Sequence, residues 1–321
     1  MSKDAKKKIN SLKAGLNSYP KALKSYCKTL NWDITRLRIA LTDEGIADEA
    51  LYLDAPNIKI IDLLTRFLSL SESSIFVMHA PVGMGKSSTK DFTIKTLNDE
   101  KEFYVAVVNN PRMTALQILK QVLRDITSND TAPRTMDLVW NQLQSSLVEL
   151  REGGITTIVW IDEAEKLNSE KLSLLRAMAD IKTFDGLKVC KIILTGTPIL
   201  QKKVDQFLET NPEDAQAYDD RSAFFTFELS KWTNKHIFEW WDLLADFSSS
   251  GGDGINPFTK DAADEVLNFS EGKPRSITQL TQMILIDKAS RVSKNNKETD
   301  ITITKSDVLL ALETQLNTSQ G

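Results

Sequence analysis

Residues 74–90, SIFVMHAPVGMGKSSTK, constrain the fold more than any other stretch of the chain. An apolar run leads into a glycine-containing turn and then into Lys86 and Ser87, as in the phosphate-binding loop pattern G-x-x-x-x-G-K-[ST]. In that pattern the backbone N–H groups of the loop and the N-terminus of the next helix bind a polyphosphate. The segment therefore predicts a buried strand, a nucleotide-binding loop and a helix.

One position of this loop departs from the pattern, because Ala80 stands where the first glycine is expected. A small residue suffices there if its φ is negative, and Pro81 stiffens the turn. We expect Lys86 to reach the β and γ phosphates of ATP and Ser87 Oγ to ligate Mg²⁺. The alternative for this motif alone is a chance Gly-Lys-Ser in a loop. The residues assigned to the nucleotide are Ala80, Pro81, Val82, Gly83, Met84, Gly85, Lys86, Ser87 and Ser88.

A second motif, TTIVWIDEAEKL at residues 156–167, supports the same site. It places Asp162 and Glu163 at the end of an apolar strand, where Asp162 can hold Mg²⁺ and Glu163 can activate the attacking water. The ordinary alternative is a helix N-cap. Glu165 and Lys166 are expected on the surface of the following turn. The two motifs stand in the order of a nucleotide-hydrolysing site, which leaves little room for a chance match.

The chain divides into three segments by its hydrophobic pattern. Residues 1–56 look like a helical, basic arm, residues 57–230 alternate between strand-like and helix-like runs, and residues 231–321 read as four helices. Apolar strands separated by helices predict an α/β fold with a parallel sheet covered on both faces. The strand-like runs are 74–80, 101–109, 154–162, 187–197 and 224–230. The helix-like runs are 87–97, 113–126, 135–152 and 169–181, then 233–247, 258–270, 275–292 and 306–316.

The distribution of charge is uneven. The net charge is −4, but residues 1–38 hold ten Lys and Arg against two Asp and Glu, so this segment is +8 and the remainder is −12. A basic segment of this kind either contacts phosphates or is the solvated face of an amphipathic helix. Asp33 is expected to cap a helix that begins at Ile34, which fits a helix-turn-helix as well as a small packing element.

Cysteine usage and hydropathy indicate a cytoplasmic protein. Cys27 and Cys190 provide neither a disulfide framework nor metal-ligand spacing, which favours a reducing compartment. The basic start of the chain is not followed by the apolar core of a secretory signal. No run approaches the roughly 18 apolar residues of a membrane helix, so we expect no membrane contact.

With these motifs in place, residues 57–321 resemble the AAA+ ATPases. The resemblance implies a P-loop core and a C-terminal helical lid, and it assigns three more positions. Thr195 or Thr197, in KIILTGTP, would be the sensor 1 residue that contacts the γ-phosphate or its attacking water. Arg221, before the last strand, would be an arginine finger for a neighbouring subunit. Arg275, in EGKPRSI, would be the sensor 2 residue of the lid. Each position also has an ordinary alternative as a strand-end, surface or helix-start residue.

Within that family the chain is similar to the ATPases that select target DNA for transposases, represented by the Mu phage B protein and the TnsC-like group, with ExeA-like ATPases as neighbours. The similar residues are GMGKSS, IDEAEKL, LTGTPIL and GKPRSI, with a further stretch at 129–147. The resemblance implies a ring or helical filament of ATP-bound subunits on duplex DNA, with sequence-independent phosphate contacts. Our candidates for those contacts are Arg112 and Arg134, and each is otherwise a plain surface arginine.

Four functions remain open at this point. The leading one is a DNA-dependent ATPase that recruits and activates a transposase, with or without a target-selection adaptor. The second is a regulator or loader that acts on a protein client in secretion or replication. The third is a small-molecule P-loop kinase, which would not need Arg221 or Arg275. A helicase with two P-loop cores is set aside, because it needs a longer chain. The fourth is an ATPase with another role, for example in phage defence.

Overall fold

The computed structural model describes residues 20–42, 45, 48–53, 55–69, 73–129, 133–210, 225–249, 251–294 and 300–319. The chain forms two compact units. One unit is residues 57–230, and the other combines residues 1–56 with residues 231–321.

The first unit contains a five-stranded, fully parallel sheet with the strand order β2-β3-β4-β1-β5. Its strands are β1 (Ile75–His79), β2 (Phe103–Val108), β3 (Thr156–Ile161), β4 (Cys190–Gly196) and β5 (Phe225–Glu228). All strands run the same way, so their carboxyl ends meet at one edge, which is where ligands of open α/β sheets bind. Both sequence motifs leave the sheet at this edge, one after β1 and the other after β3.

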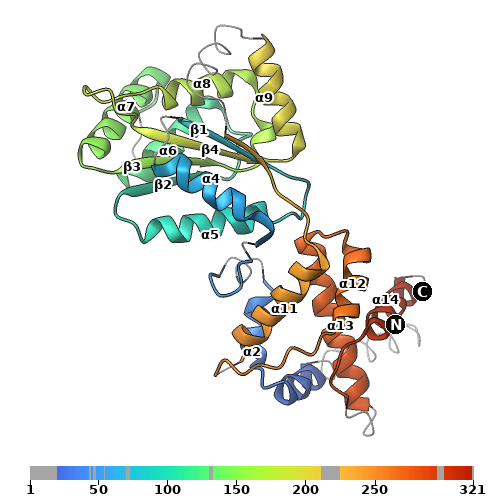
Figure 1. Cartoon of the computed structure of the whole chain (residues 1–321). Helices are drawn as coiled ribbons and strands as arrows, with labels where there is room; N and C mark the ends of the chain where they lie inside the picture. Colours follow the sequence, from blue (N-terminus) through green and yellow to red (C-terminus); the bar gives the residue numbers. More distant parts are fainter. Residues whose placement is uncertain are drawn as a thin grey trace, which may run out of the picture. The chain divides into compact units, whose positions relative to one another are not determined.

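Helices cover both faces of this sheet, as Figure 1 shows. Ile75 and Val77 of β1 pack on one face with α6 (Ala115–Thr127), α7 (Met136–Glu152), α8 (Ser169–Ala179) and α9 (Pro198–Thr210). Phe76 and Met78 pack on the other face with α4 (Ile58–Ser69) and α5 (Lys86–Asn98). Side chains alternate between the faces of a strand, so a strand buried on both sides is apolar throughout. The predicted α/β fold with a covered parallel sheet is confirmed.

The five strands and the four helices expected inside this unit are present. Within the described residues of this unit, helices α4 and α9 were not expected from the sequence. Helix α9 begins at Pro198, directly after the β4 strand, and Pro is well placed in the first turn of a helix because its missing N–H has no intrahelical partner there. That signal was available in the sequence TGTPILQKK.

The second unit is helical. It contains a helix over residues 20–29 and the helices α2 (Ile34–Ala40), α11 (Asn234–Ser248), α12 (Lys260–Ser270), α13 (Pro274–Lys294) and α14 (Lys305–Ser319). Trp240 and Trp241 of α11 are fully buried in its core. Trp241 Nε1 donates to Thr281 Oγ1 of α13 at 2.9 Å, which satisfies its buried donor.

The N-terminal helices share this core with the C-terminal helices. Tyr26, Cys27 and Leu30 lie in one hydrophobic cluster with Trp240 and Trp241. Asp33 caps α2 as expected, by accepting the backbone N–H groups of Thr35 and Arg36. The division of the sequence into three segments treated residues 1–56 as a separate arm. In the structure, the described part of that arm is instead a packed component of the helical unit.

Thr233 and Thr259 stand at the N-cap positions of α11 and α12, but only Thr233 forms a side-chain cap. Thr233 and His236 form a reciprocal capping box on α11. The Thr259 hydroxyl donates instead to the carbonyl of Ile303 at 2.9 Å, which joins the start of α12 to the segment before α14. Among the described residues, no helix is long and apolar enough to cross a membrane.

Candidate nucleotide site

The loop between β1 and α5 has the backbone of a phosphate cradle. Gly83 and Gly85 adopt φ values of 85° and 88°, in the left-handed region that glycine enters without strain. Ala80 is fully buried, its φ is not positive, and its N–H donates to the Gly196 carbonyl at 3.1 Å. A small residue is therefore what this position requires, and its backbone does not need the conformational freedom of glycine.

Helix α5 begins at Lys86, directly after the loop. The backbone N–H groups of the first turn, which includes Ser87 and Ser88, have no partner within the helix and carry its positive dipole end. Lys86 Nζ donates to the carbonyls of Ala80 and Pro81 at 2.7 and 2.9 Å, so the ammonium lies across the loop. Loop amides, a helix start and an ammonium are the groups from which anion sites are built.

Asp162 lies at the end of β3 and belongs to a hydrogen-bonded cluster. Its Oδ1 accepts from Thr195 Oγ1 at 3.0 Å and from the backbone N–H of Glu163 at 2.9 Å. Its Oδ2 accepts from Lys90 Nζ of α5 at 2.8 Å. Burial raises the pKa of Asp162, but Lys90, Thr195 and the Glu163 N–H lower it more, so the pKa lies below its ordinary value. Asp162 is therefore an ionised carboxylate at neutral pH.

Glu163 follows Asp162 in a left-handed conformation, with φ of 50°, which is uncommon for a residue other than glycine. Its side chain is about half exposed and forms an ion pair with Lys166. Strained backbone of this kind is found at functional sites more often than elsewhere. The Glu163 carboxylate is accessible, as a group that contacts substrate must be.

Glu165 was expected on the surface, and that expectation is wrong. It is half-buried against the end of β4, where its Oε2 accepts the backbone N–H of Thr197 at 3.2 Å. A Cβ on Gly196 would come within 2.5 Å of the same oxygen. Glycine at position 196 therefore makes room for Glu165, which joins the second motif to β4.

The two sensor candidates occupy different environments. Thr195 is fully buried in β4, bonds to Asp162 and accepts from Trp160 Nε1 at 3.2 Å. Thr197 lies just beyond the strand, and its buried hydroxyl has no hydrogen-bond partner among the described residues. Thr195 orients Asp162, whereas the Thr197 hydroxyl retains its hydrogen-bonding capacity.

The side chains at this edge fit Mg²⁺. Ser87 offers a hydroxyl and Asp162 a carboxylate, which are the hard oxygen ligands that Mg²⁺ prefers. No group of three or more His, Cys, Asp or Glu side chains suited to a metal occurs in the described ranges. Mg²⁺ in nucleotide sites takes one or two protein ligands and completes its shell with phosphates and water, so this donor set suits it.

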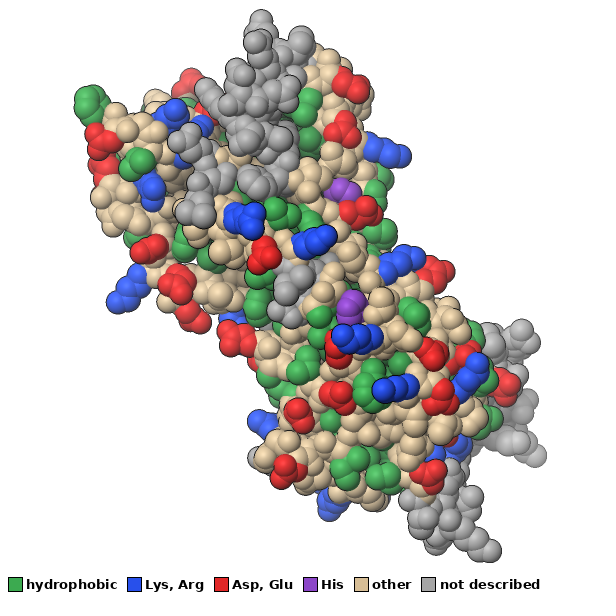
Figure 2. All heavy atoms as spheres, in the orientation of Figure 1, with side chains coloured by type: hydrophobic (Ala, Val, Ile, Leu, Met, Phe, Trp, Pro, Cys, Tyr) green, Lys and Arg blue, Asp and Glu red, His purple; other side chains and the backbone are tan. Residues whose placement is uncertain are grey.

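The remaining predicted residues belong to other segments of the chain. Arg275 is exposed at the start of α13, in the helical unit. Arg112 is exposed in the β2–α6 connection, and Arg134 is exposed two residues before α7. Arg221 lies outside the described residues. The face shown in Figure 2 carries basic and acidic side chains interspersed, without a broad field of one sign.

Sequence reasoning missed Lys90 and Asn109. Lys90 lies one helical turn after Lys86, and its Nζ contacts Asn109 Oδ1 at 3.3 Å as well as Asp162. The spacing of four residues on a helix that starts at the phosphate loop was the available signal, because it places both lysines on one face.

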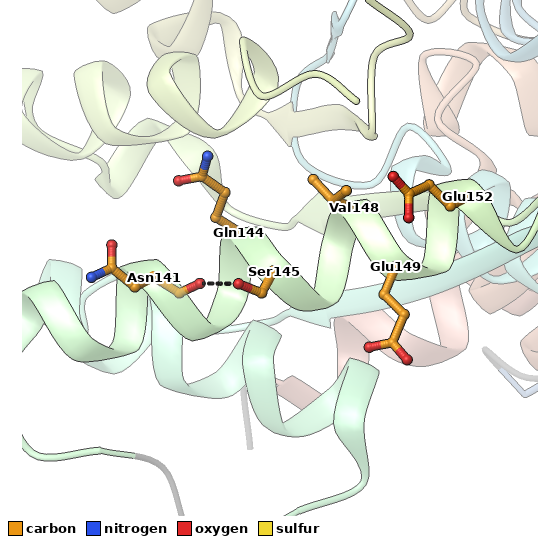
Figure 3. A pocket seen from close by; sticks show the side chains of 6 residues that line it. All are labelled: Asn141, Gln144, Ser145, Val148, Glu149 and Glu152. Carbon is orange, nitrogen blue, oxygen red and sulfur yellow. Dashed lines mark hydrogen bonds between the residues drawn. The ribbon is translucent and has the colours of Figure 1, made fainter. Parts of the chain in front are cut away.

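A groove of about 460 Å³ lies elsewhere, along α7. Figure 3 shows its lining, which consists of Asn141, Gln144, Ser145, Val148, Glu149 and Glu152. It shares no residue with the phosphate loop and presents two carboxylates, so it does not suit a polyphosphate.

Comparison with known proteins agrees with this geometry. Residues 69–204 match the family described as an AAA domain. The general secretion pathway protein A of Aeromonas hydrophila is 26% identical over 125 residues, which are 39% of this chain and 22% of that protein. The chain thus spans about a fifth of that relative's length.

Solved structures share the fold at low sequence identity. The Aeropyrum pernix ORC1 protein in complex with DNA has a TM-score of 0.56 and 13% identity, over 86% of this chain and 69% of that one. The A. pernix ORC2 protein in its ADPNP–ADP complexes has a TM-score of 0.53 and 16% identity, over 85% and 72%. Cdc6p from Pyrobaculum aerophilum has a TM-score of 0.55 and 16% identity, over 84% and 68%. The chain therefore has the fold of the AAA+ P-loop NTPases, and the match of residues 69–204 to an AAA domain points to an ATPase.

Proposed function

We propose that this protein hydrolyses ATP at the carboxyl edge of its sheet, in a DNA-dependent manner, and that the ATP-bound assembly recruits and activates a transposase. The observation that carries the ATPase part is the convergence of the two motifs. Lys90, on the helix that begins at Lys86, lies 2.8 Å from Asp162 at the end of β3. A phosphate cradle and a metal-binding carboxylate thus belong to one site.

Each residue of the site has one task in this proposal. The loop amides and Lys86 bind the β and γ phosphates, and Ser87 and Asp162 hold Mg²⁺. When bound, Mg²⁺ neutralises charge that develops on the phosphates. Glu163 orients the attacking water and accepts its proton. Thr197 contacts that water or the γ-phosphate, since its hydroxyl is not engaged within the described chain.

Two arginines complete the site from outside the α/β unit or the subunit. Arg221 acts on the nucleotide of a neighbouring subunit, so hydrolysis requires assembly into a ring or filament. Arg275 of the helical unit contacts the phosphates as the sensor of the lid. Both roles rest on the resemblance of their sequence contexts to the AAA+ motifs. They predict that dilution lowers the rate per subunit.

Two observations support DNA dependence. The motifs resemble those of transposition ATPases, and an AAA+ structure of similar fold was solved in complex with DNA. Arg112 and Arg134 are exposed on the α/β unit. In this proposal they contact the phosphate backbone of DNA. Because such contacts involve phosphates only, they position DNA without reading its sequence, and the affinity falls with salt.

A second candidate function is the control of a protein client without DNA. The match to a secretion pathway protein favours it, although that match covers only 125 residues. The two candidates share the ATPase site and differ in what stimulates it. Duplex DNA is therefore the reagent that separates them.

The test is steady-state ATP hydrolysis at low salt, with and without random-sequence duplex DNA, with Lys86→Ala as the blank. We expect stimulation by DNA that fades as salt is raised, and filaments or rings on DNA by electron microscopy. Hydrolysis that ignores DNA keeps the ATPase and transfers the proposal to a protein client. A wild-type rate equal to the blank overturns the ATPase itself.

Arg112→Ala, with the exposed Arg124→Ala of α6 as its matched control, tests the DNA contact. Loss of one phosphate contact lowers the slope of log affinity against log salt by about one. Equal slopes for the two variants exclude Arg112 from the DNA interface.

A further inference from the structure

Lys90 occupies a position that the roles assigned above leave unexplained. Its Nζ lies 2.8 Å from Asp162 Oδ2, 3.3 Å from Asn109 Oδ1 and 3.8 Å from Asp91 Oδ1. The Lys90 and Asp162 side chains are only 12% and 17% exposed. Solvent screens such a pair less than a surface pair, so its attraction is stronger than that of an exposed salt bridge.

The geometry separates the two oxygens of Asp162 by partner. Oδ1 is held by Thr195 and by the Glu163 N–H, which fix the carboxylate at the end of β3. Oδ2 faces the Lys90 ammonium. A cation that binds Asp162 at Oδ2 therefore binds an oxygen that already has a positively charged partner.

Two cations at one carboxylate repel each other. A Mg²⁺ ion held by Asp162, directly or through water, must either displace the Lys90 ammonium or tolerate it at close range. When no Mg²⁺ is bound, the Lys90 ammonium compensates the charge of Asp162, which would otherwise repel the phosphates of a nucleotide. Lys90 thus strengthens metal-free nucleotide binding and weakens the additional gain that Mg²⁺ provides.

We propose that Lys90 is a positioning residue that competes with Mg²⁺ for Asp162 and so sets how strongly nucleotide binding depends on the metal. This inference rests on the proposed function, because it assumes that the nucleotide and Mg²⁺ bind at this edge of the sheet. It gives a role to a residue for which neither sequence motif assigned one. Lys90 acts through Asp162 and takes no part in the chemical step.

The test compares nucleotide affinity with and without the metal. A fluorescent, non-hydrolysable ATP analogue is titrated with the full chain, once with saturating Mg²⁺ and once with EDTA. The readout is the ratio of the Kd in EDTA to the Kd in Mg²⁺. Lys90→Met removes the charge and keeps the length of the side chain. We expect its ratio to rise about tenfold above that of the wild type, because one close charge interaction has been removed.

Two further variants make this result specific. Lys90→Arg keeps the cation and is expected to hold the ratio within about twofold of the wild type. Lys95→Met removes an exposed lysine of the same helix and leaves the ratio unchanged. A merely structural role of Lys90 would weaken both affinities in proportion, and an unchanged ratio in Lys90→Met therefore overturns the proposal. Circular dichroism melts confirm that the variants are folded.

The failure of this inference differs from the failure of the proposed function. If the wild type binds the analogue in neither condition, the nucleotide site itself is absent and both proposals are overturned. If the wild type binds it and Lys90→Met keeps the wild-type ratio, only the role of Lys90 is lost. Neither outcome depends on DNA or on a client protein.

Discussion

The two units of the molecule each contain an enclosed carboxylate that pairs with lysine, and the two carboxylates differ in what surrounds them. Asp307, at the start of α14, accepts from Arg291 NH1 at 2.7 Å, from Lys288 Nζ at 3.3 Å and from Thr304 N at 2.9 Å. Asp162, at the end of β3, has one lysine and lies at the edge of a parallel sheet. The Asp307 side chain is 8% exposed, against 17% for Asp162.

The difference shows that a perturbed carboxylate does not by itself indicate a functional site. Burial raises the pKa of Asp307, but its hydrogen bonds and cationic neighbours lower that pKa by more, so the net shift is downward. The same balance holds for Asp162. Asp307 holds α13 to α14 and caps the latter, so its partners are structural. Asp162 lies at the edge where the parallel strands end, and under the proposed function that position gives the same chemistry a catalytic use.

The largest expected effect breaks the comparison at Asp162. Asp162→Asn removes the charge that we propose holds Mg²⁺, and we expect ATP hydrolysis to fall about 10³-fold, since a catalytic metal contributes several kcal/mol. The melting temperature is also expected to fall, because Lys90 loses the charge of its mostly buried partner, so the rate is compared per folded molecule. Asp307→Asn is the matched control, and its folded fraction should hydrolyse ATP at the wild-type rate. Equal activity losses in both variants would remove the distinction.

At Asp307 the expected effect is on stability. Asp307→Ala removes the carboxylate that Lys288 and Arg291 share, although Arg291 keeps its ion pair with Asp287, and breaking a buried ion pair costs about 3–5 kcal/mol. Urea denaturation followed by tryptophan fluorescence reports on the helical unit through Trp240 and Trp241. A loss below about 1 kcal/mol, the value of a surface ion pair, would show that water replaces the missing group.

A third enclosed ammonium sharpens the comparison through pH. Lys191 of β4 donates to the carbonyls of Phe67 and Ser73, and burial, with the charge of Arg151 second, lowers its pKa from 10.5 to about 8. Between these pH values the unfolded chain binds more protons than the folded one. The free energy of unfolding therefore rises with pH in this window, by at most about 1.4 kcal/mol per pH unit.

Lys191→Met isolates this contribution. The stability of the wild type minus that of the variant, from urea titrations at several pH values, should be lowest below pH 8 and should increase above it. Parallel curves for the two proteins would show that Lys191 titrates alike in both states.

The smallest expected effect concerns two adjacent tryptophans of α11. Trp241 Nε1 donates to Thr281, whereas buried Trp240 Nε1 has no partner within the described residues. Thr281→Val strands the Trp241 donor and should cost about 1–3 kcal/mol by urea denaturation. Trp240→Phe, the matched change without a broken bond, tests packing alone. If Thr281→Val is neutral, the hydrogen bond contributes nothing to stability.

The sequence predicted the parallel sheet and the two halves of the candidate site, because these features are written in local patterns. Apolar strands at residues 74–80 and 154–162 lead directly into the phosphate loop and into Asp162. Each motif is contiguous, and the carboxyl ends of parallel strands necessarily meet at one edge. The sequence alone therefore predicted that Lys86 and Asp162 lie at the same edge of the sheet.

What the sequence did not predict depends on contacts between distant segments. The bond from Lys90 to Asp162 spans 72 positions, and the packing of Glu165 under Thr197 depends on the glycine at position 196. The grouping of residues 20–42 with the C-terminal helices is of the same kind. Amphipathic helices show that a partner surface exists, but their periodicity does not say which surface it is.

The helical unit is built from the two ends of the chain, and this has a consequence for synthesis. The α/β unit is one continuous stretch and can fold as it leaves the ribosome. Tyr26 and Leu30, made first, obtain their neighbours Trp240 and Trp241 only after more than 200 further residues have been added. Until then these helices expose apolar surface, which is a liability for aggregation. A truncated chain without residues 20–42 would expose apolar surface permanently, because α11 would lose the surface on which it packs.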